Sequence, residues 1–187
     1  MKTTFTSSSA LVVSIVAVVL AALGSSLIAE SKPSLKAQRL ERGRYLVTIA
    51  ACHDCHSPKI DAHMTPDANR LLSGRPATTR PPLQSSGEIR ASLDLTAWAG
   101  PWGNSYAANL TPDAETGLGA RYTEASFIKT IRTGKKPEGE MLSPPMPWPV
   151  YRNMTDEDLK AIYAYLTSLK PVKNVVRAAP AATTAKR

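Results

Sequence analysis

Both cysteines of this 187-residue chain lie in one short segment, and that segment constrains the fold more than any other feature. It reads C-H-D-C-H from Cys52 to His56, with the thiols three residues apart and a histidine directly after the second. A helix is predicted just before it, over residues 35–51, because apolar residues recur there at three- and four-residue steps. The chain therefore presents two thiols and an imidazole together at a helix end.

The C-x-x-C-H spacing is the attachment motif of c-type haem. Each thiol can add to one vinyl group of the porphyrin, and the histidine then reaches one face of the iron. The motif predicts one covalently attached haem c, bound by Cys52 and Cys55, with His56 as an axial iron ligand. Two other interpretations stay open from the residues alone. A thiol–disulfide exchange site also uses C-x-x-C, although the sequence shows no βαβ context for it. A zinc site would use both cysteines and two of His53, His56 and His63.

The N-terminal segment predicts export. Lys2 is the only charge before an apolar run from Ala10 to Leu23, which only Ser14 interrupts, and small residues follow this run. The run is shorter than the ~20 residues that a spanning helix prefers, which favours a cleaved signal peptide over an uncleaved membrane anchor. We assign residues 1–29 to the signal peptide, 30–175 to one domain and 176–187 to a disordered tail. The expected location is the periplasm.

The body of the chain predicts a mainly α fold. A second helix is expected over residues 123–133, with Gly134 as its stop. A third follows Thr155, a good N-cap with acidic residues after it, and ends before Pro171. Between the first two helices, residues 57–120 form a long irregular segment rich in proline. A loop of that length needs short elements of its own, and a small hairpin is expected near residues 92–98.

The charge pattern excludes one class of partner. The formal net charge is +8, but the basic residues are scattered and form no dense run with interleaved aromatic residues. Nucleic-acid binding is therefore not expected. A modestly basic surface suits an acidic protein partner or simple solubility.

With these elements in place, the chain resembles the class I cytochrome c family, in which a helix, C-x-x-C-H, a long middle and a methionine loop precede a C-terminal helix. More closely, it is similar to periplasmic mono-haem cytochromes that pair with dehydrogenases and oxidases. The likeness covers about residues 40–172. Its further segments are L-S-G-R-P at 72–76, A-N-L-T-P-D at 108–113, E-T-G-L-G at 115–119 and P-P-M-P-W at 144–148.

The resemblance implies a cytochrome c-like fold, with helices packed around one covalently bound haem. Its first and last helices cross at close range, which implies a packing role for Gly43. The residues alone leave that glycine undecided between a packing role and a neutral exposed position. Further residues stand either as neighbours of the haem or as ordinary packing residues. These are Arg75, Trp98, Trp102, Asn109 and Trp148.

The family takes its second axial ligand from a methionine in the loop before the last helix. Met141 and Met146 both lie in the proline-rich loop 135–149. We choose Met146, because the prolines on either side of it restrict the loop before the iron–sulfur bond closes. The alternatives are Met141, His53 and His63 as the ligand, and Met146 as an apolar core residue.

The resemblance implies one-electron transfer and no catalysis of its own, by a carrier that acts alone or as a subunit of an oxidoreductase complex. Its expected partners are redox proteins, with a dehydrogenase or oxidase as donor and a terminal oxidase or another cytochrome of the respiratory chain as acceptor. Contact with a membrane is expected only if residues 1–29 are not cleaved. The alternative is a haem enzyme whose open iron position binds a small molecule, which requires that Met146 does not ligate.

Overall fold

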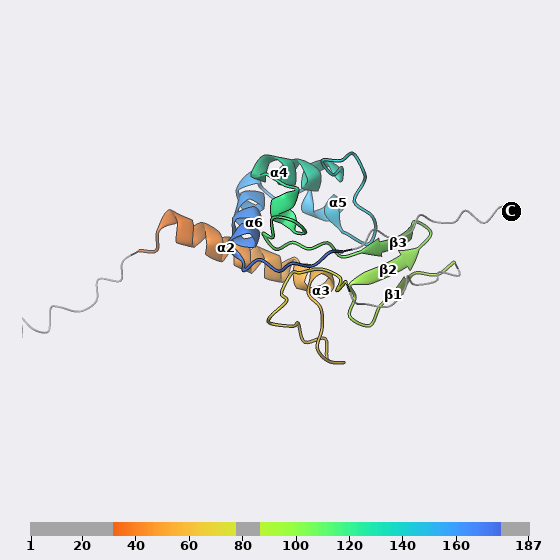
Figure 1. The fold of residues 1–187 in the computed structure, drawn as a ribbon. Coiled ribbons are helices and arrows are strands. Elements are labelled where there is room, and N and C mark those ends of the chain that lie inside the picture. The colour runs from red at the N-terminus through yellow and green to blue at the C-terminus, as the bar shows by residue number, and fades with distance from the viewer. Residues whose placement is uncertain (1–31, 78–86, 177–187) are drawn as a thin grey trace, which may run out of the picture. The chain divides into compact units, whose positions relative to one another are not determined.

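The structure is a computed structural model that describes residues 32–77 and 87–176 (Figure 1). The predicted signal peptide lies outside the described residues, as does the predicted tail apart from Val176. Residues from Ser34 onward belong to one compact unit. In the described part of the chain, no helix is both long and apolar enough to cross a membrane.

The predicted mainly α fold is confirmed, with a small antiparallel sheet inserted in the middle of the chain (Figure 1). The sheet has the order β1-β2-β3, and Ala99 of β2 pairs with Asn104 of β3. In chain order, the elements are α2 (Leu35–Ile49), α3 (Cys52–His56), β1 (Arg90–Ala91), β2 (Ala97–Gly100), β3 (Gly103–Tyr106), the 3-10 helix η1 (Leu118–Ala120), α4 (Glu124–Thr133), α5 (Trp148–Tyr151) and α6 (Asp156–Ser168).

The two later helices begin and end where the sequence predicted. The Thr123 hydroxyl accepts a hydrogen bond from the Ser126 N–H at the start of α4, and Gly134 ends that helix with φ +72°. The Thr155 hydroxyl accepts from the Asp158 N–H in the same way at the start of α6. These side chains replace partners that the first turn of a helix lacks, so local sequence determines both starts.

Helices α2 and α6 pack against each other, and Gly43 lies at their closest approach. A Cβ at position 43 would lie 2.7 Å from the Cβ of Tyr165 and closer still to the backbone oxygen of Ala161. The packing role that the resemblance implied for Gly43 is therefore confirmed. The crossing holds α2 so that its C-terminal end delivers the cysteine motif to the core.

The core is built mainly from the three long helices and two residues of the middle segment. Phe127 packs between two tyrosine rings, with centroids 6.4 Å from Tyr122 and 5.5 Å from Tyr163. The most buried side chains of this cluster are Leu46, Val47, Leu72, Leu118, Leu159, Ala161 and Leu166. Cys52 and Met146 pack against this same cluster from its edge.

The described parts of the long middle segment are ordered by buried polar contacts. Asn109 is fully buried and uses its whole amide inside the protein. Its oxygen accepts from the Thr111 N–H and hydroxyl, while its nitrogen donates to Thr116 and to the carbonyl of Val172. Asn109 is thus a packing residue, one of the two roles left open for it. It joins the middle segment to the chain that follows α6.

The predicted hairpin is confirmed, since β1 and β2 pair around a turn within the expected range. Residues 92–96 form the turn between β1 and β2, and a second hairpin joins β2 to β3. Asp94 organises the first turn by accepting from the Ser92 hydroxyl and from both the N–H and the hydroxyl of Thr96. Side-chain contacts of this kind cannot be read from hydrophobic alternation, so the sequence indicated the hairpin but not the contacts that order its turn.

Candidate haem site

The cysteine motif forms its own short helix, α3, which Ala50 and Ala51 separate from α2. Ala51 adopts a left-handed conformation, with φ 55° and ψ 29°, and α3 starts directly after it. Cys52 and Cys55 are both half-buried and form no disulfide. Three side chains that could hold one porphyrin, two cysteines and a histidine, are therefore carried on a single short helix.

His56 is buried and held in one orientation. Its Nδ1 lies 2.8 Å from the carbonyl oxygen of Ala108. Because a carbonyl can only accept, Nδ1 carries the proton and Nε2 keeps its lone pair. Burial lowers the pKa of His56, which favours the neutral form that a metal needs. A neutral imidazole with its second nitrogen fixed by hydrogen bonding is the arrangement typical of a metal-ligating histidine.

Gly74 allows close packing of its own backbone against Ala108, the residue whose carbonyl orients His56. Its N–H donates to the carbonyl of His56 at 2.8 Å, and its φ is +74°. A Cβ here would lie 2.6 Å from the carbonyl carbon of Ala108, the residue that orients His56. Glycine is needed for both reasons, because other residues disfavour positive φ and none fits this space. The L-S-G-R-P segment therefore supports the motif through its backbone.

The thiols have the electrostatic character of buried, unreactive cysteines. Burial raises the pKa of Cys52 to about 11 and also raises the pKa of Cys55. A dithiol exchange site requires the opposite shift, since the thiolate is the nucleophile. Among residues 32–77 and 87–176, no three His, Cys, Asp or Glu side chains form a group that could hold a metal. Both alternatives to haem attachment therefore lose support.

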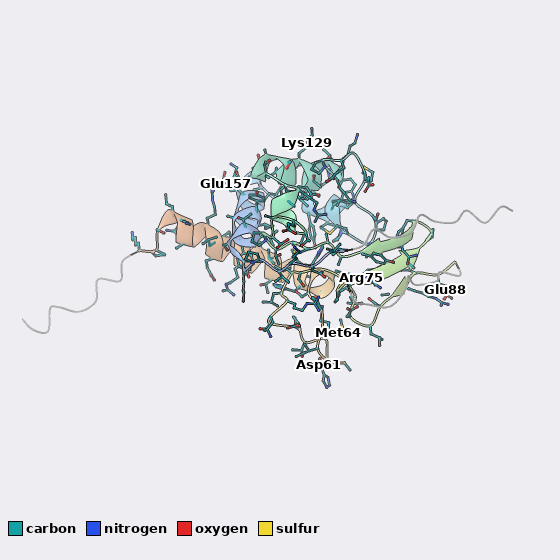
Figure 2. All side chains as sticks on the ribbon, viewed as in Figure 1. Asp61, Met64, Arg75, Glu88, Lys129 and Glu157 are labelled. Carbon is teal, nitrogen blue, oxygen red and sulfur yellow. The ribbon has the colours of Figure 1, made fainter. Side chains whose placement is uncertain are left out.

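His63 and Met141 are both exposed. His63 is exposed, on the loop marked by Asp61 and Met64, which extends away from the helices (Figure 2). Met141 has 53% of its surface exposed and pairs through its backbone with Lys135. Met146 is half-buried and packs against the core cluster together with Cys52. The structure thus places Met146 close to the same core as the motif, while its ligation of iron stays a prediction.

Two hydrogen bonds tie the methionine loop to the rest of the site. The Ser105 hydroxyl on β3 donates to the carbonyl of Pro144 at 2.6 Å. The Tyr151 hydroxyl on α5 donates to the carbonyl of Ala50, two residues before Cys52. Burial is the main reason why the pKa of Tyr151 is raised to about 12, so this donor keeps its proton at neutral pH. The loop carrying Met146 is therefore anchored on both sides.

The sheet borders the motif from a third direction. Trp98 lies close enough to Cys55 to influence the pKa of its thiol, and the Trp98 indole N–H donates to the carbonyl of Leu95 at 2.8 Å. Arg75 is buried, and its guanidinium stacks on the ring of Tyr106, 4.4 Å from the centroid. Figure 2 shows Arg75 beside the sheet and α3. Trp98 is thus a neighbour of the motif, one of the two roles left open for it.

The remaining two tryptophans make local contacts. Trp102 donates its indole N–H to the Ser105 hydroxyl at 3.3 Å, which extends the anchor of the methionine loop. Trp148 begins α5, and the guanidinium of Arg152 lies 5.8 Å from its ring centroid. Sequence reasoning missed Ser105, Tyr151 and Ala108, because all three contacts involve a backbone carbonyl distant in sequence. No sequence pattern signals such a contact.

The donor set fits a covalently attached haem. Two unpaired thiols have C-x-x-C spacing, and the adjacent imidazole presents an unprotonated nitrogen. The fold and this site define a mainly helical protein that carries haem c. The chain belongs to the cytochrome c family, whose model, described as Cytochrome c, matches residues 40–170. Members of this family bind haem covalently and transfer electrons, so the protein is an electron carrier and not a catalyst.

Curated relatives include subunits of several dehydrogenases. The chain is 34% identical over 140 residues to a nicotinate dehydrogenase subunit of Pseudomonas putida, covering 75% of the chain and 9% of that protein. It is 34% identical over 134 residues to the fructose dehydrogenase cytochrome subunit of Gluconobacter japonicus, with 71% and 22% covered. For the gluconate 2-dehydrogenase cytochrome c subunit of Pantoea cypripedii, identity is 33% over 152 residues, with 81% and 27% covered. The chain thus spans between 9% and 27% of the length of these relatives.

Proposed function

We propose that the protein carries one haem c per chain, attached through Cys52 and Cys55, with His56 as an axial ligand. Each haem of this type uses two thiols at C-x-x-C spacing, and the 187 residues contain two cysteines. A relative from Cereibacter sphaeroides is named as a diheme cytochrome, at 28% identity. The proposal rests above all on the His56–Ala108 hydrogen bond, which leaves Nε2 of a motif histidine ready to bind iron.

Met146 completes the proposed site as the second axial ligand. It packs against the core, and its loop is anchored by Ser105 and Tyr151. Haem c supplies one-electron exchange between ferrous and ferric iron when bound. The residues that would hold it are Cys52 and Cys55 through their thiols, His56 through Nε2 and Met146 through its sulfur, with Trp98 beside Cys55. A methionine ligand raises the potential relative to a second histidine.

The proposed role is a periplasmic carrier between a dehydrogenase and the respiratory chain. The relatives named above as subunits of dehydrogenases support a dehydrogenase donor. The acceptor we propose is a terminal oxidase or another cytochrome. The apolar run within residues 1–29 supports export. The haem attachment motif supports it as well, because covalent haem attachment suits a protein that is assembled outside the cytoplasm.

The first test is a pair of visible spectra of the exported protein, produced with c-type haem maturation. We expect a sharp reduced α-band that survives acid-acetone extraction, and a haem-to-protein ratio of one. The ratio distinguishes one haem per chain from none or two. Loss of all haem on extraction would overturn covalent attachment. Rapid binding of carbon monoxide by the ferrous protein at neutral pH would contradict two firm axial ligands and favour an open iron position.

The methionine assignment is tested by two matched variants. We expect Met146→Ala to abolish the weak long-wavelength charge-transfer band of the oxidised protein, because that band arises from a methionine–iron bond. Met141→Ala should leave the band intact, since Met141 is exposed. The reverse pattern would identify Met141 as the ligand, and retention of the band in both variants would exclude both residues.

A further inference from the structure

Lys59 follows the haem motif by three residues, and its side chain folds back onto the motif helix. Its Nζ donates to the backbone carbonyls of His53, Asp54 and Ser57 at 3.0, 2.8 and 2.6 Å. The last carbonyls of a helix lack partners within it, although the His53 carbonyl also accepts from the Ser57 N–H at 3.2 Å. A lysine at this end both satisfies them and complements the helix dipole. Lys59 therefore acts as a cap for α3.

The three contacts require the charged form of Lys59. An ammonium group has three N–H donors and no acceptor, which matches three carbonyl oxygens. A neutral amine has two donors and a lone pair, and the lone pair would face one of these oxygens. Burial lowers the pKa of Lys59, while the carboxylates of Asp54 and Asp94 act in the opposite direction. Direct contact with three carbonyls thus keeps a positive charge at the end of α3.

The position of this charge is determined by the loop as well as by the helix. Lys59 pairs through its backbone with Pro66, and the Ile60 N–H donates to the carbonyl of Thr65 at 3.0 Å. The Asp67 N–H donates to the carbonyl of Pro58 at 2.8 Å. These contacts hold the two ends of the loop together. The backbone of Lys59 is therefore fixed, which restricts where its side-chain ammonium can lie.

The charge of Lys59 acts on the residues that the proposed haem site uses. Its ammonium group contacts the carbonyls of His53, Asp54 and Ser57, so the charge lies against the short helix that carries Cys55 and His56. A fixed cation disfavours additional positive charge nearby. Ferric haem carries one more positive charge than ferrous haem, so the same cation favours the reduced state.

We propose that Lys59 is a positioning residue that caps the motif helix and whose positive charge raises the midpoint potential of the haem. This inference rests on the proposed attachment of haem to Cys52, Cys55 and His56. It gives a function to a residue that lies outside the C-x-x-C-H motif. The electron is supplied by the redox partner, and no bond is made or broken at Lys59.

The test is redox titration of the purified holo-protein and four variants. Lys59→Arg keeps the charge, Lys59→Gln keeps donors without charge, and Lys59→Met removes both. We expect the midpoint potential to shift downward in the Gln and Met variants and to stay near the wild-type value in the Arg variant. Lys129→Met is the matched control: this exposed lysine lies on α4 (Figure 2), and its loss should leave the potential nearly unchanged.

The outcomes separate a charge effect from a structural one. Equal potentials in all variants, with lower unfolding midpoints for Gln and Met, would reduce Lys59 to a structural cap and overturn the proposal. A shift in the Met variant that the Gln variant lacks would assign the effect to hydrogen bonding and also overturn it. If a variant fails to retain haem, titration of the Arg and Gln pair still compares charge. Absence of covalent haem in the wild-type protein would instead contradict the proposed function.

Discussion

Gly43→Ala should destabilise the protein by about 3 kcal/mol or more, since forcing extra atoms into a tightly packed contact commonly costs 1–3 kcal/mol and here the contact is backbone. The new methyl group would overlap the backbone oxygen of Ala161 and lie 2.7 Å from the Cβ of Tyr165. Neither atom can move without displacing α6. The helices would have to separate along the crossing that brings the haem motif to the core.

The sign of this effect makes the test sharp. Alanine stabilises an exposed helix position by about 1 kcal/mol relative to glycine, so a glycine without a packing role would give the opposite result. The measurement is denaturant unfolding of the holo-protein, comparing midpoints at equal m-values. Thr48→Ala on the exposed side of α2 is the control and should change stability by less than about 0.5 kcal/mol. An increase in stability for Gly43→Ala would contradict the observed crossing.

Asn109→Leu should cost a similar amount, about 3 kcal/mol or more, because a leucine of comparable size leaves several buried polar groups without partners. The carbonyl of Val172 would lose its 2.8 Å donor, and the buried N–H of Thr111 would lose its acceptor. The contact between the middle segment and the chain after α6 would weaken. That chain also holds Asn174, whose amide donates to the carbonyls of Ser73 and Arg75.

Asn153→Ala is the control for Asn109. Asn153 is exposed, and its amide makes only local contacts with Pro149 and Val150. We expect its loss to change the unfolding free energy by less than about 0.5 kcal/mol. Equal effects for the two asparagines would show that burial of the Asn109 amide does not determine its contribution. Limited proteolysis provides a second readout, since cleavage after α6 should accelerate in Asn109→Leu alone.

Local sequence was sufficient to predict several elements of the fold. The ends of α4 and α6 depend on Thr123, Gly134 and Thr155, whose effects operate within one helical turn. The C-x-x-C-H motif was equally informative, because haem attachment needs two thiols and an imidazole at fixed spacing on one segment. The family match over residues 40–170 confirms the conclusion drawn from these residues.

Long-range contacts were less accessible to sequence reasoning. The undecided role of Gly43 was settled by the close approach of α6, more than a hundred residues later in the chain. The hairpin near residues 92–98 was predicted, but the side-chain contacts by which Asp94 organises its turn were not. Lys59 carried a weak local signal, a lysine at the end of a short helix, but its three carbonyl contacts depend on how the loop folds back.

The sequence by itself determined which chemical groups the protein has for binding haem: two thiols, the motif histidine and a methionine in a proline-rich loop. Only the tertiary structure decided how these groups are oriented. The Ala108 carbonyl selects the tautomer of His56, and Ser105 and Tyr151 anchor the loop of Met146. The physical reason is that a hydrogen bond depends on the distance and direction between its donor and acceptor. For residues distant in sequence, packing of the helices determines that distance and direction.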